Sequence, residues 1–198
     1  MLHWEHSHKR SNVREVVCKV IIGGIITAGR HFADLDVDIT SPESIKAMYE
    51  TVGKVDAVVS TAGKTYFGFL QQMTPANNEK SMESKVKGQV NLVLLGLDHV
   101  NDGGSFTLIT GIIMDEPILK GASAAMASGA VKAFVQAAAI EMPRGIRINN
   151  VSPNILKESI EVYGPYFPGF VPVPGSKVAA AYVKSIEGGQ TGQTYKVY

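Results

Sequence analysis

Apolar, β-branched runs that alternate with helix-length segments constrain this chain more than any other feature. The runs lie at Val20–Thr27, Leu35–Ile39, Val55–Ser60, Ser105–Thr110, Ile146–Val151 and Thr194–Val197. Segments of helical length lie between several of them, at Pro42–Val52, Ala76–Val100, Ala122–Met142 and Ser176–Glu187. Nearly continuous apolar strands separated by helices are typical of a parallel sheet covered on both faces. The sequence therefore predicts an α/β fold with a doubly wound parallel sheet, as a single domain over residues 1–198.

Composition and charge narrow the functional classes. With 19 basic and 18 acidic residues the net charge is +1, and no basic stripe indicates a nucleic-acid surface. One cysteine, Cys18, excludes an internal disulfide framework and predicts a cytoplasmic location. The apolar run Val16–Gly29 is interrupted by Lys19 and is shorter than the roughly 20 residues of a membrane span. We therefore expect neither a nucleic-acid partner nor a membrane partner.

The predicted strand ends are rich in glycine, small hydroxyl residues and acids. They read "TAGR" (Thr27–Arg30), "DVDIT" (Asp36–Thr40), "VDAVVSTAG" (Val55–Gly63), "SFTLITG" (Ser105–Gly111) and "GIRINNVSPN" (Gly145–Asn154). In open α/β sheets, ligands bind outside the carboxyl ends of the strands. These ends are therefore where a site is expected.

Taken in order, these ends resemble the short-chain dehydrogenase/reductase family from about Ile26 to Tyr198. "DAVVSTAG" is similar to the family's Asn-Asn-Ala-Gly segment, with Ser60 and Thr61 in place of the asparagines. "RINNVSP" resembles its Arg-x-Asn-x-Val-x-Pro run, and "GGQTGQTYKVY" its last strand. The resemblance implies a Rossmann-like fold and an oxidoreductase that uses a nicotinamide nucleotide, NADP rather than NAD, on a small carbonyl or alcohol.

The resemblance also assigns a set of cofactor-binding residues. The chemistry of Arg30 supports such a role independently, because a guanidinium beside the adenosine ribose can hold a 2′-phosphate in a bidentate contact. The alternatives are a solvated loop arginine at Arg30 and a helix-capping role for Asp38. The predicted cofactor-binding residues are Gly29, Arg30, Asp38, Ile39, Ser60, Ala62, Gly63, Pro153 and Ile155.

The family's catalytic Tyr-x-x-x-Lys motif is missing. Its tyrosine position falls at Ala124 and its lysine position at Ser128, within "GASAAMASGAVKAF". The serine position keeps a hydroxyl as Thr110, and the asparagine position falls at Lys85. Thr110 and Lys85 are therefore the candidate catalytic residues. Tyr163 and Tyr166, in the loop "VYGPYFPGF" where the family keeps its substrate lid, are alternative proton donors or merely packing residues.

The start of the chain departs from the family as well. Residues 1–19 contain no glycine, whereas the family's first strand leads into a glycine-rich turn that holds the pyrophosphate. We therefore expect an altered or missing first strand and turn, and no bound cofactor if the turn is truly absent. One hypothesis is an out-of-frame reading of that motif around Trp4, which the gene's nucleotide sequence would test. The cluster His3, His6 and His8 is interpreted as a tail rather than a metal site.

Three functional interpretations follow. The chain is an NADP-dependent oxidoreductase with a rearranged proton donor, a non-catalytic nucleotide-binding or sensing protein, or a variant defective in cofactor binding. The small residues of Ala122–Met142 allow close packing against Ala76–Val100 of another subunit. The resemblance thus predicts a homodimer or homotetramer with a small-molecule substrate, without identifying that substrate.

Overall fold

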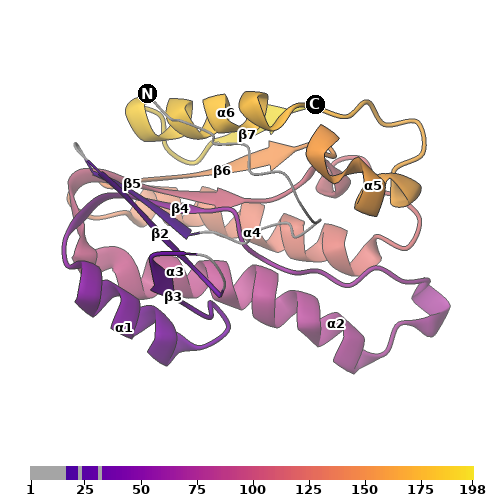
Figure 1. The fold of residues 1–198 in the computed structure, drawn as a ribbon, viewed down its shortest axis with the longest axis horizontal. Coiled ribbons are helices and arrows are strands. Elements are labelled where there is room, and N and C mark those ends of the chain that lie inside the picture. The colour runs from indigo at the N-terminus through magenta and orange to yellow at the C-terminus, as the bar shows by residue number, and fades with distance from the viewer. Residues whose placement is uncertain (1–16, 22–23, 31–32) are drawn as a thin grey trace.

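The computed structural model describes residues 17–21, 24–30 and 33–198, and it forms a sheet with the strand order β3-β2-β1-β4-β5-β6-β7 (Figure 1). The strands are β1 (Val17–Ile21), β2 (Gly24–Gly29), β3 (Leu35–Asp36), β4 (Val55–Ser60), β5 (Val100–Ile109), β6 (Arg147–Pro153) and β7 (Thr194–Val197). The pairs β2–β3, β4–β5, β5–β6 and β6–β7 are all parallel. The predicted α/β fold is therefore confirmed.

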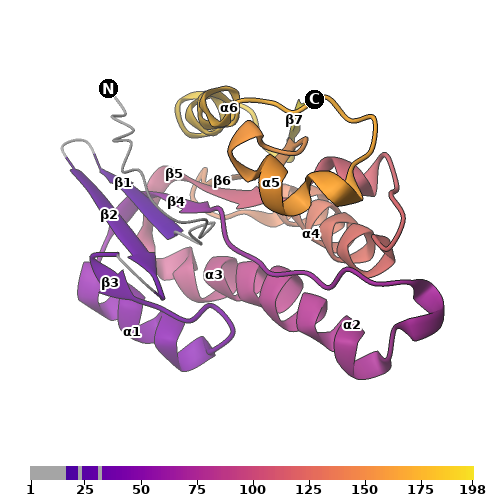
Figure 2. The same cartoon turned by 45° about the vertical axis from the view of Figure 1, so that its right-hand side comes forward.

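Helices cover the sheet in two layers. The longer helices are α1 (Pro42–Val52), α2 (Pro75–Ser81), α3 (Gly88–Gly96), α4 (Ala122–Glu141) and α6 (Gly175–Glu187), and α5 (Ile160–Tyr163) is a short one. Single turns are η1 (Leu70–Gln72), η3 (Leu97–His99), η4 (Ile112–Met114), η5 (Lys157–Ser159) and η6 (Gly164–Tyr166), and η2 (Met82–Lys87) is a π-helical segment. Figures 1 and 2 show α1, α3 and α4 on one side of the sheet and α6 on the other.

The central strand β1 runs against its neighbours. Val17 pairs with Ala28 of β2 and with Ser60 of β4, and both pairings are antiparallel. Two residues, 22–23, separate β1 from β2, whereas parallel neighbours need a crossover of a dozen or more. The prediction of one strand over Val20–Thr27 was therefore wrong, since this run forms parts of two strands. The predicted alteration of the first strand takes the form of a reversed strand in the central place.

Local capping explains why several helices begin where the sequence places them. The side chain of Ser41 accepts a hydrogen bond from the amide of Ser44 at 3.2 Å, and Pro42 occupies the first helical position of α1. Thr74 caps α2 in the same way, and Pro75 follows it. The segment predicted as one helix over Ala76–Val100 is not a regular α-helix throughout. The π-helical segment η2, at Met82–Lys87, interrupts it with a wider turn.

The largest apolar core lies between the sheet and the layer of α1, α3 and α4. Phe106, Leu108 and Ile148 of the sheet meet Leu92 of α3 and Val131 of α4 there, all fully buried. A second cluster packs α6 against β4, β6 and β7. Helix α4 is long and apolar enough to cross a membrane by length and composition, with a mean hydropathy of 1.3. It packs against β6, β5 and α3, and its residues Val131 and Val135 are fully buried in the core.

Candidate nucleotide site

A pocket opens at the carboxyl ends of β2 and β4, next to the loop after β3. The main chain closes it on one side, because the amide of Val37 donates to the carbonyl of Gly29 at 3.1 Å. Its lining consists of Ala28, Gly29, Arg30, Val37, Asp38, Ile39, Thr40, Ala62 and Ser84. The predicted cofactor residues Gly29, Arg30, Asp38, Ile39 and Ala62 thus meet in one pocket.

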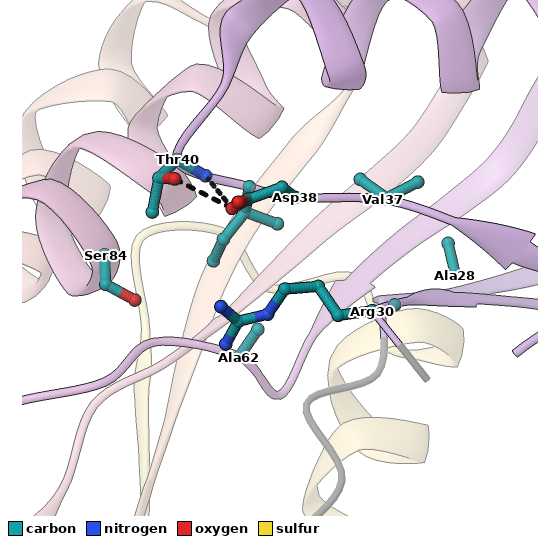
Figure 3. A pocket seen from close by; sticks show the side chains of 9 residues that line it. Ala28, Arg30, Val37, Asp38, Thr40, Ala62 and Ser84 are labelled. Carbon is teal, nitrogen blue, oxygen red and sulfur yellow. Dashed lines mark hydrogen bonds between the residues drawn. The ribbon is translucent and has the colours of Figure 1, made fainter. Parts of the chain in front are cut away.

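The pocket combines an apolar floor with two opposite charges. Val37, Ile39 and Ala62 are buried, and the side chain of Arg30 extends between Asp38 and Ala62 (Figure 3). The Asp38 carboxylate accepts hydrogen bonds from the amide of Thr40 at 2.9 Å and from its hydroxyl at 2.8 Å.

These two bonds hold the pKa of Asp38 below its ordinary value, and the positive charges of Arg30 and Lys64 act in the same direction. The carboxylate is therefore ionised at neutral pH. Both of these hydrogen bonds end on its Oδ1 atom. A carboxylate acceptor, an apolar floor and a guanidinium together suit a purine nucleoside that carries a phosphate.

Ser60 and Gly63, which were also predicted to bind the cofactor, do not line the pocket and instead take part in the packing around it. Ser60 is fully buried, its carbonyl accepts a hydrogen bond from Tyr182 at 3.0 Å, and its Oγ accepts one from the amide of Ala62 at 3.4 Å. Gly63 has a φ of +134°. A Cβ at Gly63 would lie 2.9 Å from Cδ of Lys85, so the glycine makes room for that side chain.

The two predicted catalytic residues are neighbours. The ammonium of Lys85 donates to the carbonyl oxygen of Thr110 at 3.3 Å, and Lys85 is 7% exposed. The hydroxyl of Thr110 is used within the sheet, since it donates to the carbonyl of Val151 at 3.2 Å and accepts from the side-chain Nδ2 of Asn150 at 2.8 Å. The structure therefore presents the lysine beside the main chain of Thr110, with the threonine hydroxyl turned to β6.

Pro153 and Ile155 lie at the carboxyl end of β6, beneath the segment that holds α5. The amide of Val173 donates to the carbonyl of Ile155 at 2.9 Å, and Asn154 donates to the carbonyl of Val171 at 3.0 Å. These bonds fasten the segment between η6 and α6 to the two residues that follow β6. By the strand order, this part of the predicted site is separate from the pocket at β2 and β4.

An apolar cluster occupies the surroundings of Ala124. Ala124 is fully buried and packs with Ile112 and Ile113, and aromatic residues of the loop after β4 and of the segment after η6 pack against them. The partly buried members of this cluster are Phe67, Ile118, Ala125, Phe167 and Phe170. Ser128 is 1% exposed, which leaves it no access to solvent.

The alternative donors Tyr163 and Tyr166 pack on the same aromatic group. Their rings lie 6.3 Å and 5.1 Å from the ring of Phe67, and Lys120 places its ammonium 5.9 Å from the ring centre of Tyr166. These contacts agree with a packing role for both tyrosines.

Sequence reasoning did not single out three residues that shape the site. Thr40 and Ser84 line the pocket, and Gln89 bonds to β5 beside Lys85. Thr40 is the last residue of the strand end "DVDIT", so a signal for it existed. Gln89 carries none, because glutamine in a helix is ordinarily a surface residue. Among the residues that the structure describes, no group of His, Cys, Asp and Glu side chains gathers to hold a metal ion. His3, His6 and His8 lie outside the described ranges, as does the hypothesis of an out-of-frame motif around Trp4.

Comparisons with known proteins agree on one family. A family model described as "Enoyl-(Acyl carrier protein) reductase" matches residues 23–168. The crystal structure of the protein lin1944 from Listeria innocua is 61% identical, with a TM-score of 0.86 over 87% of this chain and 86% of that chain. Versicolorin reductase 1 from Aspergillus parasiticus is 28% identical over 160 residues, covering 77% of this chain and 58% of that protein.

A further curated relative is an uncharacterized oxidoreductase of Methylorubrum extorquens, 24% identical over 163 residues, which cover 81% of this chain and 62% of that protein. The matched region thus spans about three-fifths of the length of these curated relatives.

Proposed function

Because this chain belongs to the short-chain dehydrogenase/reductase family, whose model matches residues 23–168, we propose that it binds NADP(H) and acts as an oxidoreductase on a small carbonyl or alcohol. The observation that carries the proposal is the pocket with Arg30 and Asp38 at the ends of β2, β3 and β4. The nicotinamide of such a cofactor gives or takes a hydride.

The adenosine half of the cofactor fits the residues present. Ile39, Val37 and Ala62 offer apolar contact to a purine ring, and Asp38 offers an acceptor to its amino group. Arg30 lies where the adenosine ribose would meet the end of β2. A guanidinium there favours a 2′-phosphate over a free hydroxyl, which supports NADP rather than NAD.

The pyrophosphate does not find its usual cradle among the described residues. That cradle is a glycine turn followed by a helix N-terminus at the carboxyl end of a parallel first strand. Here β1 is antiparallel to β4. The carboxyl end of β1 therefore lies at the amino-terminal end of β4, away from the pocket. Only two residues, 22–23, separate β1 from β2, which is too few for a helix. We therefore derive no reaction step through the cofactor.

A second function, nucleotide binding without catalysis, is favoured by the surroundings of Ala124. The methyl group of Ala124 has no proton to give, and Ser128 has no charge. Both are buried, within 1% of full burial. General acid catalysis typically supplies about 10²–10⁴-fold of rate, so its loss would leave carbonyl reduction slow.

Fluorescence titration of NADPH and NADH tests the binding proposal. We expect NADPH to bind more tightly, and Arg30→Ala to weaken NADPH by about tenfold or more with little effect on NADH, since a charged hydrogen bond contributes about 1.5–3 kcal/mol. Lys46→Ala, which removes an exposed charge of α1 outside the pocket, is the control. Equal affinities for the two nucleotides would contradict the choice of NADP.

Oxidation of NADPH across a panel of carbonyl compounds separates the two functions. Turnover at an ordinary enzymatic rate of about 1–10³ per second would support the oxidoreductase and exclude the binding-only alternative. Binding of NADPH without turnover would favour the alternative.

Assembly and location complete the proposal. A homodimer or homotetramer through α3 and α4 is supported by the exposed apolar side chains Leu94 and Met126, which are 56% and 44% exposed. A cytoplasmic location is supported by the single cysteine of the chain.

A further inference from the structure

Lys85 follows a pocket residue in the chain, and its ammonium lies at the carboxyl end of β5. Ser84, the preceding residue, lines the pocket, and its hydroxyl accepts a hydrogen bond from the amide of Lys64 at 2.9 Å. From there the Lys85 side chain passes Gly63 and ends 3.3 Å from the carbonyl oxygen of Thr110. A ligand that extends from the pocket along the strand ends toward β5 therefore meets this side chain.

A glutamine fixes the wide turn from which Lys85 projects. Gln89 is fully buried, and its side-chain amide donates to the carbonyl of Lys85 at 3.1 Å and to the carbonyl of Ile109 at 2.9 Å. Its Oε1 atom accepts a hydrogen bond from the amide of Ile109 at 2.8 Å. The π-helical segment η2 is thereby tied to β5. Such segments are rare and are found frequently at functional sites.

Lys85 adds a third positive charge to one edge of the sheet. Arg30 and Lys64 lie close enough to Asp38 to favour its ionised form, and Lys85 follows them toward β5. A dinucleotide phosphate carries negative charge in its pyrophosphate as well as in its 2′-phosphate. Because Lys85 is 7% exposed, its interaction with a negative group is weakly screened by water.

We propose that Lys85 binds the part of the dinucleotide that extends beyond the adenosine, and that Gln89 is the positioning residue that holds Lys85 for this contact. The inference rests on the proposed function. It assigns to a lysine of η2 the charge that neither a glycine turn nor Ser128 supplies in this chain.

Two ligands of different length test the proposal by calorimetry. Adenosine 2′,5′-bisphosphate fills the adenosine pocket alone, whereas NADPH also reaches toward β5. We expect Lys85→Met to raise the Kd of NADPH by about tenfold or more and to leave that of the bisphosphate within about twofold. Gln89→Leu should raise the Kd of NADPH several-fold with the same selectivity, because it frees the turn but keeps the ammonium.

Lys87→Met is the matched control, since it removes the same charge from the same segment. Its ammonium is paired with Glu79 at 2.5 Å and its side chain is 58% exposed, so both Kd values should stay unchanged. A circular-dichroism spectrum like that of the unaltered protein is the check that each variant is folded.

The outcomes separate this inference from the proposed function. An unchanged Kd of NADPH in Lys85→Met, or an equal loss of both ligands, would overturn the role of Lys85 and leave the pocket standing. The role of Lys85 would also be overturned if the unaltered protein bound the bisphosphate as tightly as NADPH. Absence of NADPH and bisphosphate binding altogether would refute the proposed function and this inference with it.

Discussion

The contact between Gly63 and Lys85 predicts the cost of adding one methyl group. Gly63→Ala places a side chain at a φ of +134°, which costs about 1–3 kcal/mol of backbone strain. The new Cβ would also lie 2.9 Å from Cδ and 3.1 Å from Cα of Lys85, and overpacking of this kind costs about 1–3 kcal/mol more. Since about 1 kcal/mol shifts Tm by about 2–4 °C in a chain of this size, we expect Tm to fall by at least about 4 °C.

Thermal and urea unfolding measure this cost against a matched glycine. Gly53 has a φ of +65° and no atom within 4 Å of its Cβ position, so Gly53→Ala reports strain without overlap. In a Lys85→Ala background the Gly63→Ala cost should fall toward the Gly53→Ala value, because the crowded Cδ is gone. A Gly63→Ala variant as stable as Gly53→Ala would refute the packing of Lys85 on Gly63.

Three further predictions concern other parts of the molecule. The carboxylate of Asp115, held by Lys196 at 2.7 Å and Lys132 at 3.3 Å, has a pKa lowered to about 2, with hydrogen bonding to Lys196 as the largest cause. Asp115→Asn should therefore lower the free energy of unfolding by about 1–2 kcal/mol at pH 7. This difference between the variant and the unaltered protein shrinks below about pH 4 and vanishes near pH 2, and urea unfolding at each pH would measure it. Met126→Glu puts a charge on the exposed face of α4 and should reduce the mass in light scattering to that of one 21.2 kDa chain; an unchanged mass would contradict the helix interface. Ala124→Tyr should lower Tm by about 2–12 °C without raising carbonyl reduction, because Ala124 is fully buried in an apolar cluster; a stable and active variant would show that this space can open.

The sequence predicts those elements best whose ends carry local chemical signals. Helix α1 and strands β4 and β7 have the predicted bounds. For α1 this follows from Ser41 and Pro42, which fix the first turn through contacts within four residues. The reversal of β1 depends instead on which strands it pairs with, at Ala28 and Ser60, and that long-range choice leaves no periodic trace in the run Val20–Thr27.

The same distinction between local signals and long-range contacts holds for the residues of the candidate site. Arg30 comes one residue after β2 and Asp38 two residues after β3, so their meeting in one pocket follows from the parallel arrangement of these two strands. The surroundings of Lys85 depend on the π-helical turn and on Gln89, and both arise from contacts between η2 and β5 rather than from residue order. The sequence placed a lysine near the catalytic position but gave no sign of what holds it there.

Arg30 and Lys85 are proposed to contact different parts of the nucleotide. In the proposed function, Arg30 would discriminate between a phosphate and a hydroxyl on the adenosine ribose, which is the difference between NADP and NAD. Lys85 lies toward β5, where the two dinucleotides are chemically identical. We therefore expect Arg30→Ala to lower the ratio of NADPH to NADH affinity, whereas Lys85→Met should weaken both dinucleotides by the same factor and leave that ratio unchanged. A change of the ratio in Lys85→Met would mean that its ammonium reaches back to the 2′-phosphate, and that all three cations serve the adenosine end of the site.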